Sequence, residues 1–229
     1  MIRRAVAAVA VAVMAISVLA AVSTARTAAA VPSAATHVLV VGDSVAAGWT
    51  LQSAQVAWPA RLADRLWGEN HSRITVEAVG GRCLVAPGCA GTPIAQVWAT
   101  EVLGASPTPS TVILAAGEND VSRVSADVIE AAIAQLVDEA DAAGVRVLVA
   151  TIPPQESSRW TSWWGWGPTM LQVNAWIRAT YGNNVIDFHA ALVDTNGWMR
   201  TVCESGDGVH PNRYGHVDLS DSVPLGRIQ

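Results

Sequence analysis

The sequence contains no lysine, so all 14 of its Lys/Arg positions are arginine. A lysine amine forms the Schiff base in imine catalysis, and a lysine ammonium binds the phosphates in a P-loop. The absence of lysine therefore excludes both kinds of site. Charged residues are also scarce, at 14% of the chain, whereas 51% of the residues are hydrophobic. This composition favours a globular protein with a sizeable buried core over a disordered one.

Cysteine is rare as well, with three residues in the chain. Cys83 and Cys89 flank a short turn and can close a small disulfide loop, which leaves Cys203 as a free thiol or an intermolecular partner. A disulfide between Cys203 and either of the other two is an open alternative. No cysteine has zinc-finger spacing, and the five histidines include no pair four residues apart on an expected helix. We therefore predict no metal site.

The first 30 residues have the pattern of a secretory signal peptide. Arg3 and Arg4 precede an apolar run of mostly alanine and valine, and the small residues 28–30 offer a cleavage site. We predict a signal peptide over residues 1–30, a linker over 31–36, and a single domain over 37–229 that is secreted to the extracellular space. The alternative is an uncleaved membrane anchor, but alanine favours membrane insertion only weakly. No stable membrane insertion is expected after cleavage.

The charge balance is acidic, with a net charge of −5 at neutral pH. Three of the positive charges, on Arg3, Arg4 and Arg26, belong to the leader region, so the rest of the chain carries −8. An acidic body without a basic run predicts that neither nucleic acid nor an anionic membrane surface is a partner.

The hydrophobic pattern alternates short apolar runs with longer amphipathic segments. Such alternation predicts βαβ units, and hence a three-layer α/β/α sandwich with a parallel five-stranded sheet. The expected strands are residues 37–41, 74–79, 111–116, 145–150 and 184–187. The expected helices are residues 56–67, 93–103, 125–143 and 169–180, with loops at 46–55 and 153–168.

Polar residues follow several of these strands at the point where each strand ends. Asp43 and Ser44 follow the first strand, Gly80–Gly81 the second, and Asn119 the third. In open α/β sheets, ligands bind at this edge. A further polar group, Asp207-x-x-His210, stands near the carboxyl end of the chain. An aspartate three residues before a histidine can accept a hydrogen bond from one ring nitrogen, which leaves the other nitrogen for Ser44.

Residues next to His210, Ser44 and Asn119 have structural interpretations of their own. Pro211 is expected in the first turn of a helix, which would fix the position of His210. Asp43 and Asp120 are interpreted as residues that brace their turns rather than as catalytic acids.

The order Gly42-Asp43-Ser44, Gly81, Gly117-x-Asn119-Asp120, Asp207-x-x-His210 resembles the SGNH hydrolases, also called the GDSL lipase/esterase superfamily. The resemblance implies a flavodoxin-like fold and hydrolysis of esters without a cofactor. It also implies that Ser44 is the nucleophile, His210 the general base and Asp207 its orienting partner. The implied oxyanion hole consists of the Ser44 amide, the amide of Gly81 in preference to Gly80, and the Asn119 side chain. The chain departs from the family at Val76, where an asparagine is usual.

Three functions are consistent with this pattern, and all are expected of a monomer. The leading one is a secreted esterase that acts on small acyl esters, lipids or acetylated carbohydrates. The second is a carbohydrate O-acetyl esterase that uses the tryptophan-rich loop Trp160–Trp166 as a platform for sugar rings. The third is a catalytically silent binding module with the same fold.

Overall fold

A single parallel sheet forms the centre of the domain. The computed structural model describes residues 36–70, 72–155 and 166–228, and in them the strand order is β2-β1-β3-β4-β5. The strands are β1 (His37–Gly42), β2 (Arg73–Ala78), β3 (Thr111–Ala115), β4 (Arg146–Ala150) and β5 (Val185–Ile186). Gly42, the last residue of β1, is paired with Ala78 and Ala115, the last residues of β2 and β3. Three strand ends therefore meet beside Ser44.

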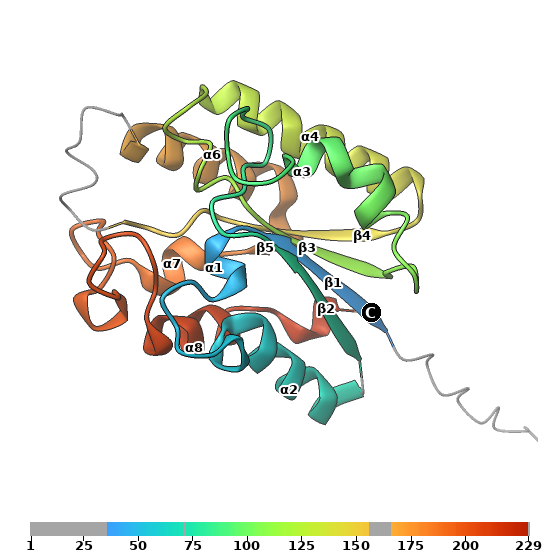
Figure 1. The fold of residues 1–229 in the computed structure, drawn as a ribbon, viewed down its shortest axis with the longest axis horizontal. Helices are drawn as coiled ribbons and strands as arrows, with labels where there is room; N and C mark the ends of the chain where they lie inside the picture. The colour runs from blue at the N-terminus through green and yellow to red at the C-terminus, as the bar shows by residue number, and fades with distance from the viewer. Residues whose placement is uncertain (1–35, 71, 156–165, 229) are drawn as a thin grey trace, which may run out of the picture. The chain divides into compact units, whose positions relative to one another are not determined.

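Helices cover both faces of the sheet, as Figure 1 shows. They are α1 (Ser44–Ala47), α2 (Trp58–Asn70), α3 (Ile94–Val97), α4 (Ala126–Ala142), α6 (Trp166–Tyr181), α7 (Phe188–Leu192) and α8 (Arg213–Asp221). A π-helical turn, Trp98–Val102, follows α3. Helices α4 and α6 lie on one face and helices α2 and α8 on the other, which confirms the predicted three-layer α/β fold.

The side chains of β1 alternate between two hydrophobic cores. Leu39 and Val41 belong to the core beneath α4 and α6, whereas Val38 and Val40 belong to the core beneath α2, α7 and α8. All six residues of β1 are buried, because a strand covered on both faces has no solvent side. Burial on both faces fixes the register of β1, and with it the position of the residues that follow.

Helix α8 begins two residues after Pro211, so the prediction that Pro211 lies in the first turn is wrong. Asn212 is the N-cap instead, and its side chain accepts hydrogen bonds from the amides of Tyr214 and Gly215 at 2.8 and 3.2 Å. These bonds satisfy two amides that have no partner within the helix, which proline could not do. Pro211 pairs with Glu204 in an antiparallel bridge.

Two expected loops contain helix. The segment 46–55 holds the end of α1 and the start of a 3₁₀ turn, Ala54–Val56. The segment 153–168 gives way to α6 at Trp166, because proline is tolerated in a first helical turn, where Pro168 lies. The predicted sugar platform was placed largely on Trp160, Trp163 and Trp164, and these three residues lie outside the described residues.

In residues 36–70, 72–155 and 166–228, no helix combines the length and the hydropathy that a membrane span needs. The predicted signal peptide, residues 1–30, falls outside these ranges. Export and cleavage of the leader therefore stay predictions.

Candidate active site

Ser44 is held at the end of β1 by a sharp turn into α1. Only glycine fits at position 42, because a Cβ there would lie 2.6 Å from the carbonyl oxygen of Ala115 and 2.7 Å from the Cβ of Ala46 in α1. Asp43 caps α1, and its Oδ1 accepts a hydrogen bond of 3.0 Å from the amide of Val45. Ser44 is the first residue of α1 and is 5% exposed. The backbone of Ser44 is therefore fixed, and its side chain has little contact with bulk solvent.

A line of hydrogen bonds joins Ser44 to His210 and Asp207. The Oγ of Ser44 lies 2.8 Å from Nε2 of His210, and Nδ1 of His210 lies 2.6 Å from Oδ2 of Asp207. The other oxygen of Asp207 accepts from the amides of Val209 and His210 at 2.9 and 2.8 Å. The structure thus brings together the three residues that the sequence singled out, although Ser44 and His210 are 166 residues apart in the chain.

The electrostatics of Asp207 fix the role of each ring nitrogen of His210. Burial raises the pKa of Asp207, but hydrogen bonds from the amide and the ring of His210 and from the Val209 amide outweigh it and lower the pKa to about 2. An ionised carboxylate only accepts hydrogen bonds, so Nδ1 of His210 is assigned the hydrogen that points to Asp207. Nε2 is then free to accept the hydrogen of the Ser44 hydroxyl.

The loop that carries His210 is closed on itself by Glu204. Its carboxylate accepts hydrogen bonds from the amides of Gly206 and Gly208 at 2.8 and 2.5 Å. The carbonyl of His210 accepts a further bond of 3.1 Å from the amide of Ser205. These contacts fix the backbone on both sides of Asp207. Glu204 could not be identified from the sequence, because a carboxylate that binds backbone amides two and four residues ahead has no distinctive sequence pattern.

Two further predicted residues, Gly81 and Asn119, lie after β2 and β3, the neighbours of β1. Gly81 has a positive φ of 76°, a conformation that favours glycine. The Nδ2 of Asn119 donates a hydrogen bond of 2.9 Å to the carbonyl of Arg82. An amide nitrogen has two hydrogens, so Asn119 has a second one to donate.

The side chain of Asp120 braces a neighbouring loop, whereas the sequence predicted that it would brace its own turn. It is fully buried, and its two carboxylate oxygens accept from the amides of Leu84, Val85 and Ala86 at 2.7, 2.9 and 2.8 Å. The same loop is closed by a disulfide between Cys83 and Cys89, which is one of the pairings that the sequence left open. Cys203 is a free, buried thiol.

Trp49 forms an exposed wall next to His210. The centroid of its ring lies 6.3 Å from that of His210, and 58% of the residue is exposed. A side chain at Gly80 would begin 3.2 Å from the Trp49 ring, so glycine at that position leaves room for the indole. This contact could not be predicted from the sequence, since nothing local distinguishes Trp49 from a core tryptophan.

Among the described residues, no three histidine, cysteine, aspartate or glutamate side chains are grouped so that they could hold a metal ion. The acidic groups at the site instead accept hydrogen bonds from backbone amides, as Asp120 and Asp207 do. The chemistry that this arrangement supports is transfer of a proton from a hydroxyl to an imidazole.

The model of the GDSL-like lipase/acylhydrolase family matches residues 40–217, more than three quarters of the chain. The chain belongs to the GDSL-like lipase/acylhydrolase family. It is therefore a GDSL-family esterase or lipase, that is, a carboxylic ester hydrolase. A search of curated proteins finds no match.

Solved structures resemble this GDSL-family esterase in fold. A GDSL-like lipase from Bacteroides thetaiotaomicron superposes with a TM-score of 0.63 at 18% identity, over 85% of this chain and 89% of the other. A lipolytic G-D-S-L protein from Veillonella parvula gives 0.63 at 16% identity, over 82% and 96%. A variant of an acetyl xylan esterase from Geobacillus stearothermophilus gives 0.65 at 19% identity, over 82% and 92%.

Proposed function

We propose that this GDSL-family esterase is a secreted serine hydrolase of acyl or acetyl esters, with Ser44 as the nucleophile and His210 as the general base. Asp207 orients His210 and stabilises its charged form. The observation that carries the proposal is the continuous line of hydrogen bonds from Asp207 through His210 to Ser44. Its support is geometric, because a serine hydroxyl becomes nucleophilic near neutral pH only beside a positioned base.

The first half of the proposed reaction acylates Ser44. Nε2 of His210 takes the hydroxyl proton of Ser44 while Oγ attacks the ester carbonyl carbon, which gives a tetrahedral oxyanion. Collapse of this intermediate breaks the bond to the alcohol oxygen, and the alcohol leaves with the proton that His210 held. In the second half, His210 takes a proton from water, the hydroxide attacks the acyl-enzyme, and Ser44 leaves with that proton.

The oxyanion needs donors that are in place before the reaction begins. We assign this role to the amide of Ser44, the amide of Gly81 and the free hydrogen of Asn119 Nδ2. The bond from Asn119 to the carbonyl of Arg82 supports the assignment, because it fixes the orientation of the side-chain amide. One such donor typically contributes about 3 kcal/mol to the lowering of the barrier.

The test of this proposal is the initial rate on p-nitrophenyl esters from acetate to palmitate, with wild type beside Ser44→Ala. The proposal predicts hydrolysis by wild type and loss of the rate in the variant. The chain-length optimum then distinguishes an acetyl esterase from a lipase. If Ser44→Ala keeps the wild-type rate, the serine mechanism is wrong. A folded wild type that neither turns over nor reacts with a fluorophosphonate would instead be a silent binding module.

The extracellular location is part of the proposal and is supported by two features. The first 30 residues have the signal-peptide pattern, and a disulfide such as Cys83–Cys89 persists in an oxidising compartment. Expression of the full chain in a secreting host tests it. Esterase activity in the medium, with an N-terminus near residue 31, is the expected result, and full-length protein kept in the membrane would contradict it.

A second candidate, hydrolysis of O-acetyl groups on carbohydrates, is favoured by Trp49. An exposed indole beside the base is suited to stack on a sugar ring. This proposal predicts that Trp49→Ala raises KM for acetylated xylooligosaccharides several-fold, whereas Trp49→Phe changes it less. KM for p-nitrophenyl acetate should stay within about twofold in both variants. An equal rise for both substrates would favour contact with the acyl group over contact with a sugar.

A further inference from the structure

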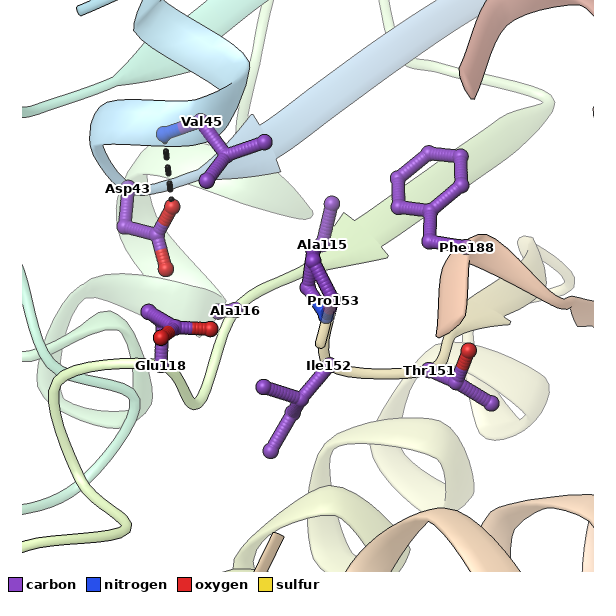
Figure 2. Close-up of a pocket in the computed structure, with 9 residues that line it drawn as sticks. All are labelled: Asp43, Val45, Ala115, Ala116, Glu118, Thr151, Ile152, Pro153 and Phe188. Atoms are coloured by element: carbon purple, nitrogen blue, oxygen red, sulfur yellow. Dashed lines mark hydrogen bonds between the residues drawn. The ribbon is translucent and has the colours of Figure 1, made fainter. Parts of the chain in front are cut away.

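Two buried carboxyl groups, Asp43 and Glu118, line the same small cavity (Figure 2). Only 2% of Asp43 and 6% of Glu118 is exposed. The cavity offers about 10 Å³ to the centres of water-sized molecules, which is the space of a single water. Each acid directly precedes a residue of the proposed mechanism, since Asp43 is followed by Ser44 and Glu118 by Asn119.

The two carboxyl groups differ in their hydrogen bonds. Asp43 accepts from the amide of Val45, which favours its charged form. One oxygen of Glu118, Oε1, accepts from the side chain of Gln155, which is itself buried. The other oxygen, Oε2, is buried without a hydrogen-bond partner among the described residues. A charged carboxylate in that position would leave an oxygen unsatisfied, at a higher cost than a neutral acid would incur.

The charges around the cavity also oppose ionisation of both acids. Burial is the main cause that raises the pKa of Asp43 to about 7, although the Val45 amide lowers it and the charge of Asp120 raises it further. Burial raises the pKa of Glu118 to about 8, with Gln155 acting against the rise and the charge of Asp43 adding to it. The pair therefore keeps at least one proton up to about pH 8.

Among the described residues, the other elements that line the cavity contribute no compensating positive charge. The segment that follows β4 contributes Thr151, Ile152 and Pro153, and α7 contributes Phe188. Asp120, which follows β3, is a further ionisable group whose charge acts on Asp43. None of the lining residues that the structure describes can therefore neutralise a second carboxylate.

We propose that Glu118 is a positioning residue that works in its protonated form and keeps the turns of Ser44 and Asn119 in their active geometry. The inference rests on the proposed function of Ser44. Loss of the proton from Glu118 places a second negative charge next to Asp43 inside the fold. The repulsion between the carboxylates then acts on the two turns that carry the nucleophile and the proposed oxyanion donor, and activity falls.

The variant Glu118→Gln mimics the protonated state. Its amide oxygen can still accept from Gln155, and its NH₂ group stands where the protonated Oε2 would be. The experiment measures, from about pH 6 to about pH 9, kcat/KM for p-nitrophenyl acetate and the rate of Ser44 labelling by a fluorophosphonate. Glu69→Gln removes the same charge from an exposed position of α2 and is the matched control.

Wild type and Glu69→Gln are expected to lose about tenfold in both rates between about pH 7 and pH 9, as one deprotonation near pH 8 requires. Glu118→Gln should lose less than about twofold over this range and match wild type within about threefold at pH 7. An alkaline loss in Glu118→Gln equal to that of wild type would overturn the inference. So would a large loss at every pH, since the ionised carboxylate would then be needed.

Infrared titration of wild type provides a second readout that requires neither activity nor a folded variant. The inference predicts a protonated-carboxyl C=O band at neutral pH that is lost by about pH 9. The absence of such a band in wild type would refute the inference. If wild type neither turns over esters nor reacts with the fluorophosphonate at any pH, the proposed function fails. The infrared band still tests whether the pair of Asp43 and Glu118 holds a proton, and its loss in Glu118→Gln assigns that proton to Glu118.

Discussion

Replacement of Asp120 by asparagine should destabilise the domain, because the carboxylate of Asp120 satisfies three backbone amides, two of them buried. Oδ1 accepts from Val85 and Ala86, and Oδ2 accepts from Leu84. Asparagine keeps one oxygen and places an NH₂ group in the position of the other. An NH₂ group cannot accept, so at least one backbone amide in the 84–86 loop loses its partner.

The magnitude follows from the kind of bond that is lost. A buried donor without a partner costs about 1–3 kcal/mol, and the remaining bonds weaken because the acceptor is no longer charged. We expect a loss of about 3 kcal/mol in the free energy of unfolding. In a domain of this size, each kcal/mol corresponds to about 2–4 °C, so Tm should fall by about 6–12 °C.

Differential scanning calorimetry of Asp120→Asn measures this fall, with Asp64→Asn on the exposed side of α2 as the matched control. The control should stay within about 0.5 kcal/mol of wild type. A Tm of Asp120→Asn within about 2 °C of wild type would show that the three bonds do not stabilise the fold. The reasoning about the brace would then be wrong.

Two further predictions concern the other polar groups near the site. In Asp207→Asn, the amides of Val209 and His210 should still bind the remaining side-chain oxygen, so the new NH₂ group faces Nδ1 of His210 and favours the wrong tautomer of the ring. The expected result in steady-state kinetics is a fall in kcat of about 10³–10⁴-fold. A fall of less than about tenfold would contradict this prediction. Burial is the main cause that lowers the pKa of His216 to about 4, so the unfolded chain binds a proton between about pH 6.5 and pH 4 that the native state does not. The free energy of unfolding should therefore fall by about 3 kcal/mol as the pH decreases through that window. Urea unfolding at a series of pH values should show a smaller fall for His216→Asn than for wild type. Parallel pH dependences of the two proteins would refute this prediction.

The parts of the site that depend on local chemistry were predictable from the sequence. Strand β1 has a continuous run of branched residues, and Gly42 permits the turn that presents Ser44. Asp207 and His210 lie three residues apart on one loop, so their hydrogen bond requires no knowledge of the tertiary fold. For the same reason, the short disulfide loop between Cys83 and Cys89 was among the predicted pairings.

The contacts between distant segments were not predictable in the same way. Glu118 meets Gln155 across 37 residues, and Asp120 reaches the amides of the 84–86 loop across 34 to 36. Whether a carboxyl group keeps its proton depends on how completely neighbouring elements exclude water from it, and no sequence pattern records that. The start of α8 was misplaced because the side-chain contacts of Asn212 decide where that helix begins.

The central claim is that Ser44 is the nucleophile and that His210 activates it. The most direct measurement is the labelling of wild type, Ser44→Ala and His210→Ala by a fluorophosphonate, with the modified peptide identified by mass spectrometry. The account predicts one phosphonate on Ser44 in wild type, none in Ser44→Ala, and labelling of His210→Ala that is slower by at least about 10²-fold. Labelling of a different serine, or an unchanged rate in His210→Ala, would contradict it.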